Sequence, residues 1–450
     1  MKIVDSAVTF TIAAIFLCLG SGAAFAGMYA YIPNTGSNSI AVVDFDTDEI
    51  AAEIAVEDSP QAVAVTSDGQ YVFVANSNSG TVSVIQTSHI STSQDDVICT
   101  VNIGGELGGM ALDRDNKALW VVSSSTNKAA KLDLSDMDNI QTTTISVGDN
   151  PRGVAVFRDG ETVFVTNADD DTVTVISNGG ASTIDVGDSP GGIVAGRYND
   201  YVYVANEGDG AISVIDGEEL EVVKTITVGS GPCALALASW GSYLYAANQA
   251  DGTVSIINAV TFSVLEEGVA VGSSPSGLSV PLNGSDAYVT DSTDNTLSIV
   301  DLDGNVTTMD NAYLNTSNIV DLNGPMGLGC FIGGDAPDAP DDLTVSNVGE
   351  TSFKITWNDN SNTEDGFKLE IKQEAQDEAE YKIWALIDES EESYWVTGLN
   401  DGITYNVRLA AYTEGADSGF STSASASTDE SEDDDDDDSN NDCFIGSLFH

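Results

Sequence analysis

Histidine and cysteine, the side chains that most often bind metals or act in catalysis, are scarce in this chain. Its 450 residues include two histidines and five cysteines, and Cys18 lies in an N-terminal apolar stretch. The other cysteines are spread too widely for a dense disulfide framework or a metal motif: Cys99, Cys233, Cys330 and Cys443. We expect Cys233, in an apolar segment, to be a buried side chain rather than a reactive thiol. An enzyme needs a convergent set of such groups, so the composition favours a protein without catalytic activity.

Among the side chains that can bind a metal ion, the abundant ones in this sequence are carboxylates in short turns. Asp169, Asp170 and Asp171 are consecutive in one predicted turn, and related turns carry Asp or Glu as well. Calcium binds six to eight oxygen ligands in flexible geometry, so calcium is the one cofactor that the sequence suggests. Asp-rich sequences also form tight hairpin turns for purely conformational reasons. Both interpretations of Asp169–Asp171 stay open.

A second group of candidate residues follows the prolines of a repeated turn motif. Because this motif precedes a strand of small residues, we expect the side chain after each proline to lie near the central axis of the fold. The predicted ligand contacts are Gln61, Arg152, Ser276 and Met326. Arg152 is a rare cation that can hold an anionic group. The alternative is an ion pair with a neighbouring carboxylate such as Asp149 or Asp159.

These candidates belong to a unit that recurs along the chain. Two short apolar strands flank a turn, and the first strand closes on a polar residue in seven copies that lie 39 to 47 residues apart: Asn34, Asn76, Ser123, Asn167, Asn206, Asn248 and Asp291. A period of this length, made of short strands, is typical of propeller blades. The prediction is an all-β fold with a seven-bladed β-propeller over residues 27–333.

Each predicted blade has an inner strand before the hairpin and a more polar outer strand after it, such as Glu221–Val228. The first blade lacks its inner strand, and the last inner-strand motif, Gly324–Phe331, has no hairpin after it. We therefore expect Gly324–Phe331 to pair beside Tyr31–Asn34. This pairing closes the ring and removes two open sheet edges.

The hairpin Tyr71–Ile85 (YVFVANSNSGTVSVI) and the linkers Val147–Gly153, Val186–Gly192 and Val271–Gly277 resemble the YVTN β-propeller family. This family occurs in surface-layer and other exported microbial proteins. The resemblance covers about residues 27–333 and implies the propeller fold. The motif residues are structural, and we expect the Asn that closes each strand to hydrogen-bond turn backbone.

A second domain follows a linker at residues 334–341. Seven short candidate strands lie within residues 342–428, which predicts a β-sandwich. Trp357 and the segment Leu399–Tyr412 resemble the fibronectin type III pattern. That resemblance implies that the hydroxyl of Tyr405 ties its strand to nearby backbone, as a tyrosine corner.

The two ends of the chain carry separate signals. Residues 1–26 have the charge, apolar core and Ala-x-Ala site of a secretory signal peptide, and no further membrane span is predicted in the mature chain. Residues 429–442 form an acidic linker that cannot bury a core, and the tail 443–450 is apolar. We expect Cys443 to serve attachment at the surface. The alternatives are a functionless end or a disulfide to Cys330.

The net charge of −58 excludes nucleic acid and anionic membranes as partners. The expected location is secreted, periplasmic or at the cell surface. The leading hypothesis is a non-enzymatic adhesion or interaction module, with the propeller as a rigid protein- or glycan-binding surface and the sandwich as a stalk. One alternative is a structural subunit of a surface layer or fibre, which binds copies of itself. The other is a hydrolase or oxidoreductase that uses the mouth of the propeller channel.

Overall fold

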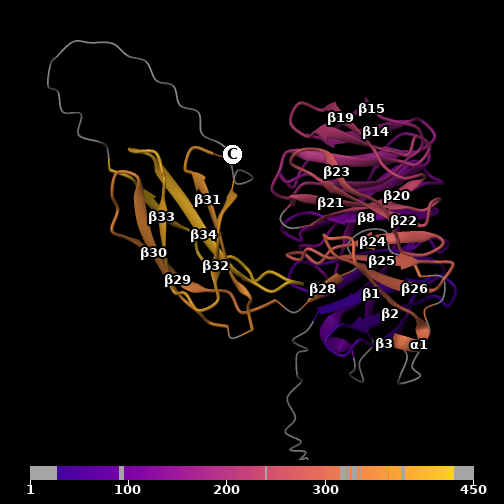
Figure 1. The fold of residues 1–450 in the computed structure, drawn as a ribbon, viewed down its shortest axis with the longest axis horizontal. Coiled ribbons are helices and arrows are strands. Elements are labelled where there is room, and N and C mark those ends of the chain that lie inside the picture. The colour runs from indigo at the N-terminus through magenta and orange to yellow at the C-terminus, as the bar shows by residue number, and fades with distance from the viewer. Residues whose placement is uncertain are drawn as a thin grey trace, which may run out of the picture.

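The computed structural model places two units side by side, a ring of β-sheets and a smaller β-sandwich (Figure 1). Two single-turn helices are described, η1 (Thr87–His89) and α1 (Asn311–Leu314). Within the described part of the chain, no helix has the length and apolar character needed to cross a membrane. The structure describes residues 28–90, 96–238, 241–314, 322, 325–326, 332–334, 336–361, 363–376 and 381–429.

The ring consists, within the described ranges, of seven four-stranded antiparallel sheets in a propeller-like arrangement. The first strands of successive sheets contact one another and surround the axis. From the innermost strand outward, the sheets are β28–β1–β2–β3 (Ile332–Gly334, Met28–Asn34, Ser39–Asp44, Glu49–Ala55), β4–β7 (Pro60–Val65, Tyr71–Asn76, Thr81–Gln86, Val97–Asn102), β8–β11 (Leu107–Leu112, Ala118–Ser123, Lys128–Asp133, Gln141–Ser146), β12–β15 (Pro151–Val156, Val163–Asn167, Thr172–Ser177, Gly180–Asp185), β16–β19 (Pro190–Ala195, Tyr201–Asn206, Ala211–Asp216, Glu221–Thr227), β20–β23 (Pro232–Ala238, Tyr243–Asn248, Thr253–Asn258, Ser263–Ala270) and β24–β27 (Pro275–Ser279, Ala287–Asp291, Thr296–Val300, Val306–Met309).

The central strands of each sheet are buried on both faces because neighbouring sheets stack against each other. Residues Val72–Ala75 of β5 are all 0% exposed. Phe73 and Ala75 pack with β8 and β9 of the next sheet, whereas Val72 and Val74 pack with β1 and β2 of the preceding one. Two-sided burial explains why these strands are continuous apolar runs instead of alternating polar and apolar residues. The outer strands are more polar, as expected: β19 is largely exposed.

The asparagine that closes the second strand of a sheet is completely buried and bonds to side chains. Nδ2 of Asn76 donates to the hydroxyls of Thr81 (3.2 Å) and Ser83 (2.9 Å). Asn248 makes the corresponding bonds in its own sheet. The partners of this Nδ2 group are thus hydroxyls and not turn backbone, whereas Oδ1 of the equivalent Asn167 accepts the backbone N–H of Gly148 in the linker turn at 3.1 Å, as expected. Thr81 stands opposite Asn76 in the ladder and Ser83 lies two residues further on the same face, so both hydroxyls are within reach.

The two ends of the propeller segment close the ring, and the described residues of the predicted segment lie beside β1. Ile332–Gly334 (β28) pairs with Met28–Ala30 of β1. From the predicted segment Gly324–Phe331, Pro325 bridges Asn34, and the backbone N–H of Met326 donates to the carbonyl oxygen of Pro33 at 3.0 Å. Residues 324 and 327–331 lie outside the described ranges. The described part of the segment therefore pairs beside Tyr31–Asn34, as predicted.

The second unit is a sandwich of two antiparallel sheets, and its seven strands confirm the seven predicted ones. The hydroxyl of Tyr405 accepts a hydrogen bond from the backbone N–H of Asn400 at 3.0 Å, which confirms the predicted tyrosine corner. Trp357 packs edge-to-face on Phe367 in the core, with ring centroids 5.3 Å apart. The sheets are β29–β30–β33 (Asp341–Ser346, Ser352–Asn358, Ser393–Thr397) and β32–β31–β34–β35 (Lys382–Asp388, Gly366–Gln373, Thr404–Tyr412, Ala424–Ser427).

Candidate functional site

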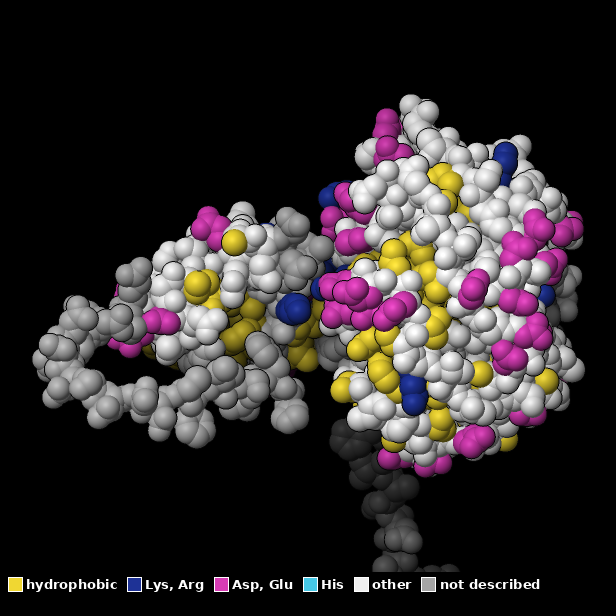
Figure 2. Space-filling model, turned by 90° about the horizontal axis from the view of Figure 1, so that it is seen from above, with side chains coloured by type: hydrophobic (Ala, Val, Ile, Leu, Met, Phe, Trp, Pro, Cys, Tyr) yellow, Lys and Arg dark blue, Asp and Glu magenta, His cyan; other side chains and the backbone are white. Residues whose placement is uncertain are grey.

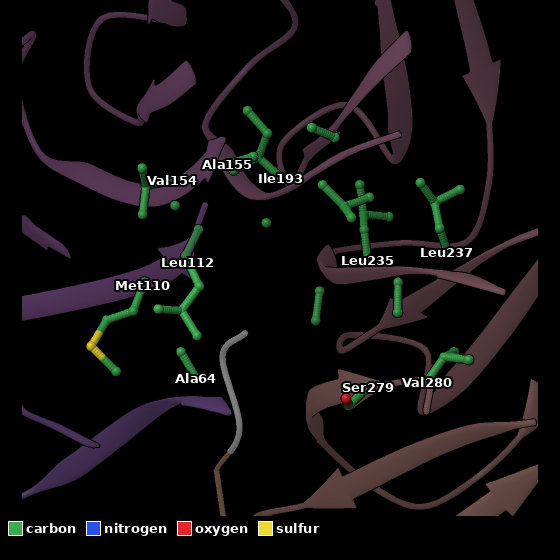
Figure 3. A pocket seen from close by; sticks show the side chains of 18 of the residues that line it. Ala64, Met110, Leu112, Val154, Ala155, Ile193, Leu235, Leu237, Ser279 and Val280 are labelled. Carbon is green, nitrogen blue, oxygen red and sulfur yellow. The ribbon is translucent and has the colours of Figure 1, made fainter. Parts of the chain in front are cut away.

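The inner strands of the propeller surround a channel of about 560 Å³. Its wall carries many small and branched apolar side chains, and Figure 3 shows several of them arranged around the middle of the ring. The lining residues labelled there are Ala64, Met110, Leu112, Val154, Ala155, Ile193, Leu235, Leu237, Ser279 and Val280. A volume of this size lies within the usual range of small-molecule sites, roughly 300–1,000 Å³.

Glycines allow the inner strands to approach each other closely at one end of the channel. A Cβ atom added to Gly192 of β16 would lie 2.5 Å from the carbonyl oxygen of Cys233 on β20. A Cβ added to Gly153 of β12 would lie equally close to the carbonyl oxygen of Gly191. The small residues of the inner-strand motif therefore determine how narrow the ring can be.

Arg152 lies at the exposed mouth of the channel, which is formed where the inner strands begin. Its guanidinium pairs with Glu207 of the neighbouring blade at 2.5 Å, and the two side chains are 42% and 39% exposed. The partner is thus neither Asp149 nor Asp159, the neighbours expected from the sequence. Glu207 is distant in sequence but comes from the hairpin turn of the next blade, which the ring brings beside β12.

The other predicted contacts of the exposed mouth have different surroundings. Ser276 lines the channel but is buried, and its hydroxyl donates to the carbonyl oxygens of Pro325 (2.9 Å) and Thr290 (3.3 Å). Met326 is half-buried and lines the channel. Gln61 is half-buried and is not among the described residues that line it. The structure thus brings Arg152, Ser276 and Met326 to one mouth, and their role in ligand binding stays a prediction.

Cys233 at this mouth should be chemically unreactive. Burial, and then the negative charge of Glu207, raise the pKa of its thiol to about 12. The thiolate is the reactive form, so only about one molecule in 10⁴ carries it near pH 8. We expect iodoacetamide to alkylate Cys233 at least about 100-fold more slowly in the folded protein than in urea. Peptide mass spectrometry over time measures both rates, and equal rates would contradict the burial of this thiol.

The opposite mouth of the channel is covered by the sandwich. Its loop between β34 and β35 donates the backbone N–H of Asp417 to the carbonyl oxygen of Ser67 at 2.9 Å. The backbone N–H of Asn283 donates to the carbonyl oxygen of Glu414 at 3.0 Å, and Nδ2 of Asn283 donates to Thr413. Gly415 of the same loop lines the channel. The sandwich is therefore docked as a cap, whereas the sequence suggested a stalk.

A network of buried ion pairs, called the junction below, holds the cap. Glu370 of β31 bridges Arg114 of the propeller (2.5 Å) and Arg408 of the sandwich (2.7 Å). Asp417 accepts hydrogen bonds from Lys368 and, at 3.4 Å, from Arg197 of the propeller. Glu370 and Lys368 have 0% of their side chains exposed. Figure 2 shows basic and acidic side chains gathered where the two units meet.

Asp417 is the anchor of the junction. Its side chain is 6% exposed, and burial by itself would raise its pKa. The positive charges of Lys368 and Arg197 outweigh that effect and lower the pKa below the ordinary 3.8. A carboxyl with a lowered pKa stabilises the folded state above its ordinary pKa, and this stabilisation is lost as the pH falls through the lowered value.

Sequence reasoning missed the junction, although the repeat carries a signal for it. Arg114, Arg158 and Arg197 each follow the end of an inner strand by two residues, in three successive blades. This arginine row lines the channel beside the cap. The chain has only 14 Lys and Arg residues, so three arginines at one repeat position indicate a shared task. Arg114 and Arg197 find their partners Glu370 and Asp417 on the other unit, which no repeat could reveal, whereas Arg158 pairs with Asp200 and Glu218 of the propeller.

The Asp-rich turn of blade β12–β15 makes structural hydrogen bonds. Asp170 accepts the backbone N–H of Asp149 (2.7 Å), Asp169 accepts Nδ2 of Asn150 (3.0 Å), and Asp171 accepts the backbone N–H of Ser189 in the next blade (2.9 Å). The hydrogen bond from a linker backbone N–H to a carboxylate of the hairpin turn recurs at Asp209, Asp251 and Asp294. Among the residues that the structure describes, no group of three His, Cys, Asp or Glu side chains is placed to hold a metal. Calcium at Asp169–Asp171 stays a prediction.

Acidic side chains are scattered over the propeller face seen in Figure 2, with few basic ones among them. With a net charge of −58, screening of this repulsion should stabilise the fold. We expect molar NaCl to raise the melting temperature of the propeller by about 3 °C, which corresponds to roughly 2 kcal/mol at about 2.1 cal/mol/K per residue. Parallel melts in chelator and in millimolar calcium test the calcium prediction. Identical curves in low salt, high salt and calcium would contradict both expectations.

Several sequence predictions fall on segments outside the described residues. These are the signal peptide (1–26), Cys330, nearly all of the acidic linker (429–442) and the tail with Cys443. Among the described residues, Cys99 and Cys233 are free thiols. Attachment through Cys443 and its alternatives stay predictions.

Comparison with known proteins supports the two-unit description. Residues 338–427 match the family model of the fibronectin type III domain. The chain is similar in structure to a functionally unknown protein from Desulfotomaculum acetoxidans DSM 771 (TM-score 0.55, 15% identity, 69% of this chain and 99% of that one). It is also similar to streptogramin B lyase (TM-score 0.51, 13% identity, 67% of this chain and 91% of that one). At these identities the likeness shows the fold alone. No curated protein matches the sequence.

The chain therefore combines a propeller-like ring with a C-terminal fibronectin type III domain, as predicted. The boundaries predicted for the domains, including 342–428 for the second one, stay an expectation. The likeness to solved structures covers about the length of the ring. The specific YVTN resemblance stays an expectation.

Proposed function

We propose that this chain is an exported, non-enzymatic interaction module that binds a protein or a glycan at a cell surface. The fibronectin type III domain supports this proposal, because such domains commonly mediate protein interactions in extracellular proteins. The observation that carries the proposal is an exposed pair of large apolar side chains on that domain. Trp384 is 39% exposed and Leu386 is 44% exposed.

Both side chains belong to β32, which is an edge strand of its sheet. Trp384 and Leu386 are two residues apart, so their side chains lie on the same face of the strand. Lys368, which stands opposite Leu386 in the ladder, belongs to this face as well. Exposed tryptophan is enriched at the energetic centres of protein interfaces. An edge strand also offers unpaired backbone groups to an extended segment of a partner.

The position of the sandwich on the propeller supports the same function. The junction fixes the sandwich on one mouth, so a partner meets a single rigid body with two accessible regions. One region is the edge strand β32. The other is the exposed mouth at Arg152 and Glu207, where a half-exposed ion pair can exchange partners with a charged ligand.

A photo-reactive phenylalanine analogue tests the contact. It is placed at Leu386 and, as a matched control, at Val260, which is 71% exposed in the turn between β22 and β23. On the producing cells, irradiation should link a partner from position 386 and not from position 260. Trp384→Ala should lower the adduct yield about tenfold, the loss expected of a central interface residue.

The mass of the adduct identifies the partner as protein or glycan. Equal adducts from both positions, or none from position 386, would refute the proposed contact. An adduct between two copies of this chain would replace the proposal by the alternative of a structural surface-layer subunit.

A further inference from the structure

The sandwich has a second surface, on the sheet that faces away from the propeller. The sheet β32–β31–β34–β35 makes the docking contacts, because Glu370 of β31 pairs with Arg114 of the propeller. The two sheets of a sandwich pack face to face, so the outer face of β29–β30–β33 lies on the opposite side. Figure 1 shows β30 and β33 on the side of the sandwich that points away from the ring. The docked propeller therefore leaves this outer face uncovered.

Hydroxyl side chains dominate this outer face. The register of the three strands places outward side chains in three rows: Thr344, Thr356 and Ser393; Ser346, Lys354 and Trp395; Ser352 and Thr397. Six of these eight side chains are hydroxyls, and the set is called the hydroxyl face below. None of the eight is buried. They alternate along the strands with the buried core residues Phe353, Ile355 and Val396, which fixes their outward direction.

Trp395 is the one large apolar side chain of the hydroxyl face, and it is 48% exposed. It stands opposite Lys354 in the ladder. Ser393 and Thr397 lie two positions away on the same strand, at a spacing of roughly 6.6 Å that follows from the strand rise. Because β33 is an edge strand, no further strand of this sheet lies beyond the indole. The ring is thus a partly exposed aromatic surface with polar side chains around it.

The hydroxyl face carries no carboxylate, although the whole chain has 72 Asp and Glu residues. On β29 the acidic side chains stand at the end of the strand, where Asp341 and Asp342 accept hydrogen bonds from Nδ2 of Asn358. A single apolar side chain is too little for the buried centre of a protein interface, which is about 65% apolar. The net charge of −58 repels nucleic acid and anionic membranes. These observations favour an uncharged ligand that carries hydroxyl groups.

We propose that the hydroxyl face binds a neutral polysaccharide with flat, β-linked pyranose rings, one of which stacks on Trp395. The faces of such a ring carry C–H groups, which pack on the negative face of the indole. Its edge carries hydroxyls, and the Ser and Thr side chains both donate hydrogen bonds to such groups and accept them. The ammonium group of Lys354 adds donors for the ring and glycosidic oxygens. This site is separate from the contact at Trp384 and Leu386 and does not depend on it.

Affinity electrophoresis of the full chain tests the site with polymers of known charge. We expect gels that contain hydroxyethylcellulose or glycol chitin, two neutral β-linked polysaccharides, to retard the protein. Carboxymethylcellulose has the same backbone as hydroxyethylcellulose but is anionic, and it should bind about tenfold more weakly because the acidic chain repels it. Retardation at a series of polymer concentrations gives each Kd. Absence of retardation by both neutral polymers, or equal affinity for the neutral and the anionic cellulose, would overturn the proposal.

Variants of Trp395 localise the binding. Trp395→Leu keeps an apolar side chain but removes the flat ring, and it should raise the Kd at least about tenfold. Trp395→Phe keeps a smaller ring and should lose less affinity. The matched control is Leu265→Ala, at a 47% exposed position on the propeller strand β23, and it should bind like the wild-type protein. Unchanged binding by folded Trp395→Leu would overturn the proposal.

Trp384→Ala separates this surface from the proposed contact on β32. Polysaccharide binding should be unchanged in this variant, and cross-linking from position 386 should be unchanged in Trp395→Leu. Polysaccharide binding that is lost in Trp384→Ala and kept in Trp395→Leu would move the glycan to β32, which overturns this inference and leaves the proposed function intact. Circular dichroism confirms that each variant is folded. Thr397→Val, which removes one hydroxyl beside the ring and should raise the Kd about threefold, replaces Trp395→Leu if that variant is unfolded.

Discussion

Replacing Asp417 by asparagine should destabilise the docked fibronectin type III domain by about 3–5 kcal/mol, the cost of breaking a buried ion pair. The substitution keeps the size of the side chain and removes its charge. Lys368, which has 0% of its side chain exposed, and Arg197 then lose the carboxylate that both contact. Because the chain has two units, hydrogen exchange of residues 404–429 is a better measure than a single unfolding curve.

Glu389→Gln is the matched control for Asp417→Asn. It removes one negative charge from an exposed turn of the same domain and should change stability by less than about 0.5 kcal/mol. The pH dependence provides a second test. The pKa of Asp417 is lowered from 3.8, so the advantage of the wild-type protein over Asp417→Asn should be constant above about pH 5. It should decline as the pH falls below 3.8 and disappear as the pH falls through the lowered pKa of Asp417. Equal hydrogen-exchange rates in Asp417→Asn and Glu389→Gln would contradict the stabilising role of Asp417.

Gly192→Ala should destabilise the propeller by about 1–3 kcal/mol, the usual cost of overpacking. Its added Cβ would lie 2.5 Å from the carbonyl oxygen of Cys233 and 3.0 Å from Cα of Ala234. Both contacts are with backbone atoms of the next inner strand, so no side-chain rotation can relieve them. The ring would have to widen locally.

The adjacent glycine supplies the control for this substitution. A Cβ on Gly191 would meet the carbonyl oxygen of Cys233 at 3.9 Å, an ordinary contact. Gly191→Ala should therefore be neutral, or stabilising by about 0.4–1 kcal/mol through the lower entropy of the unfolded chain. Urea unfolding followed by tryptophan fluorescence compares the two variants. Similar midpoints for both would show that the distance between inner strands is not limited by Gly192.

Much of the fold could be predicted because each blade repeats a local pattern. The turn residues, the apolar hairpin and the strand-closing Asn76 recur with a fixed period, and the tyrosine corner at Tyr405 follows from its neighbours in sequence. Ring closure followed from counting strands, since an inner strand was missing at one end and left over at the other. Pro325 indeed bridges Asn34, and the ladder of β28 with Met28–Ala30 lies directly after the predicted segment.

The candidate sites were harder to predict because they depend on contacts between distant segments. Arg152 was placed correctly at a mouth, yet its partner Glu207 comes from the next blade and not from the neighbouring sequence. The junction joins Arg114 to Glu370 across 256 positions of the chain. Arg114 shares its repeat position with Arg158 and Arg197, but no sequence pattern marks Glu370, so only the docking of the two units reveals the ion pair.

The pairing of β28 with β1 also affects how the chain is made. Met28–Ala30 emerges early during synthesis, but its partner Ile332–Gly334 follows about 300 residues later. At about 5–20 residues per second, the inner edge of β1 waits roughly 15 to 60 s for that partner. An unpaired edge strand invites aggregation during this interval. Gly415 of the sandwich lies against Gly333 and Gly334, so the second domain can cover the closing strand only after the ring is complete. The last assembly step of the propeller is therefore set by the order of translation, and a holding chaperone should matter most for nascent chains that have not yet reached β28.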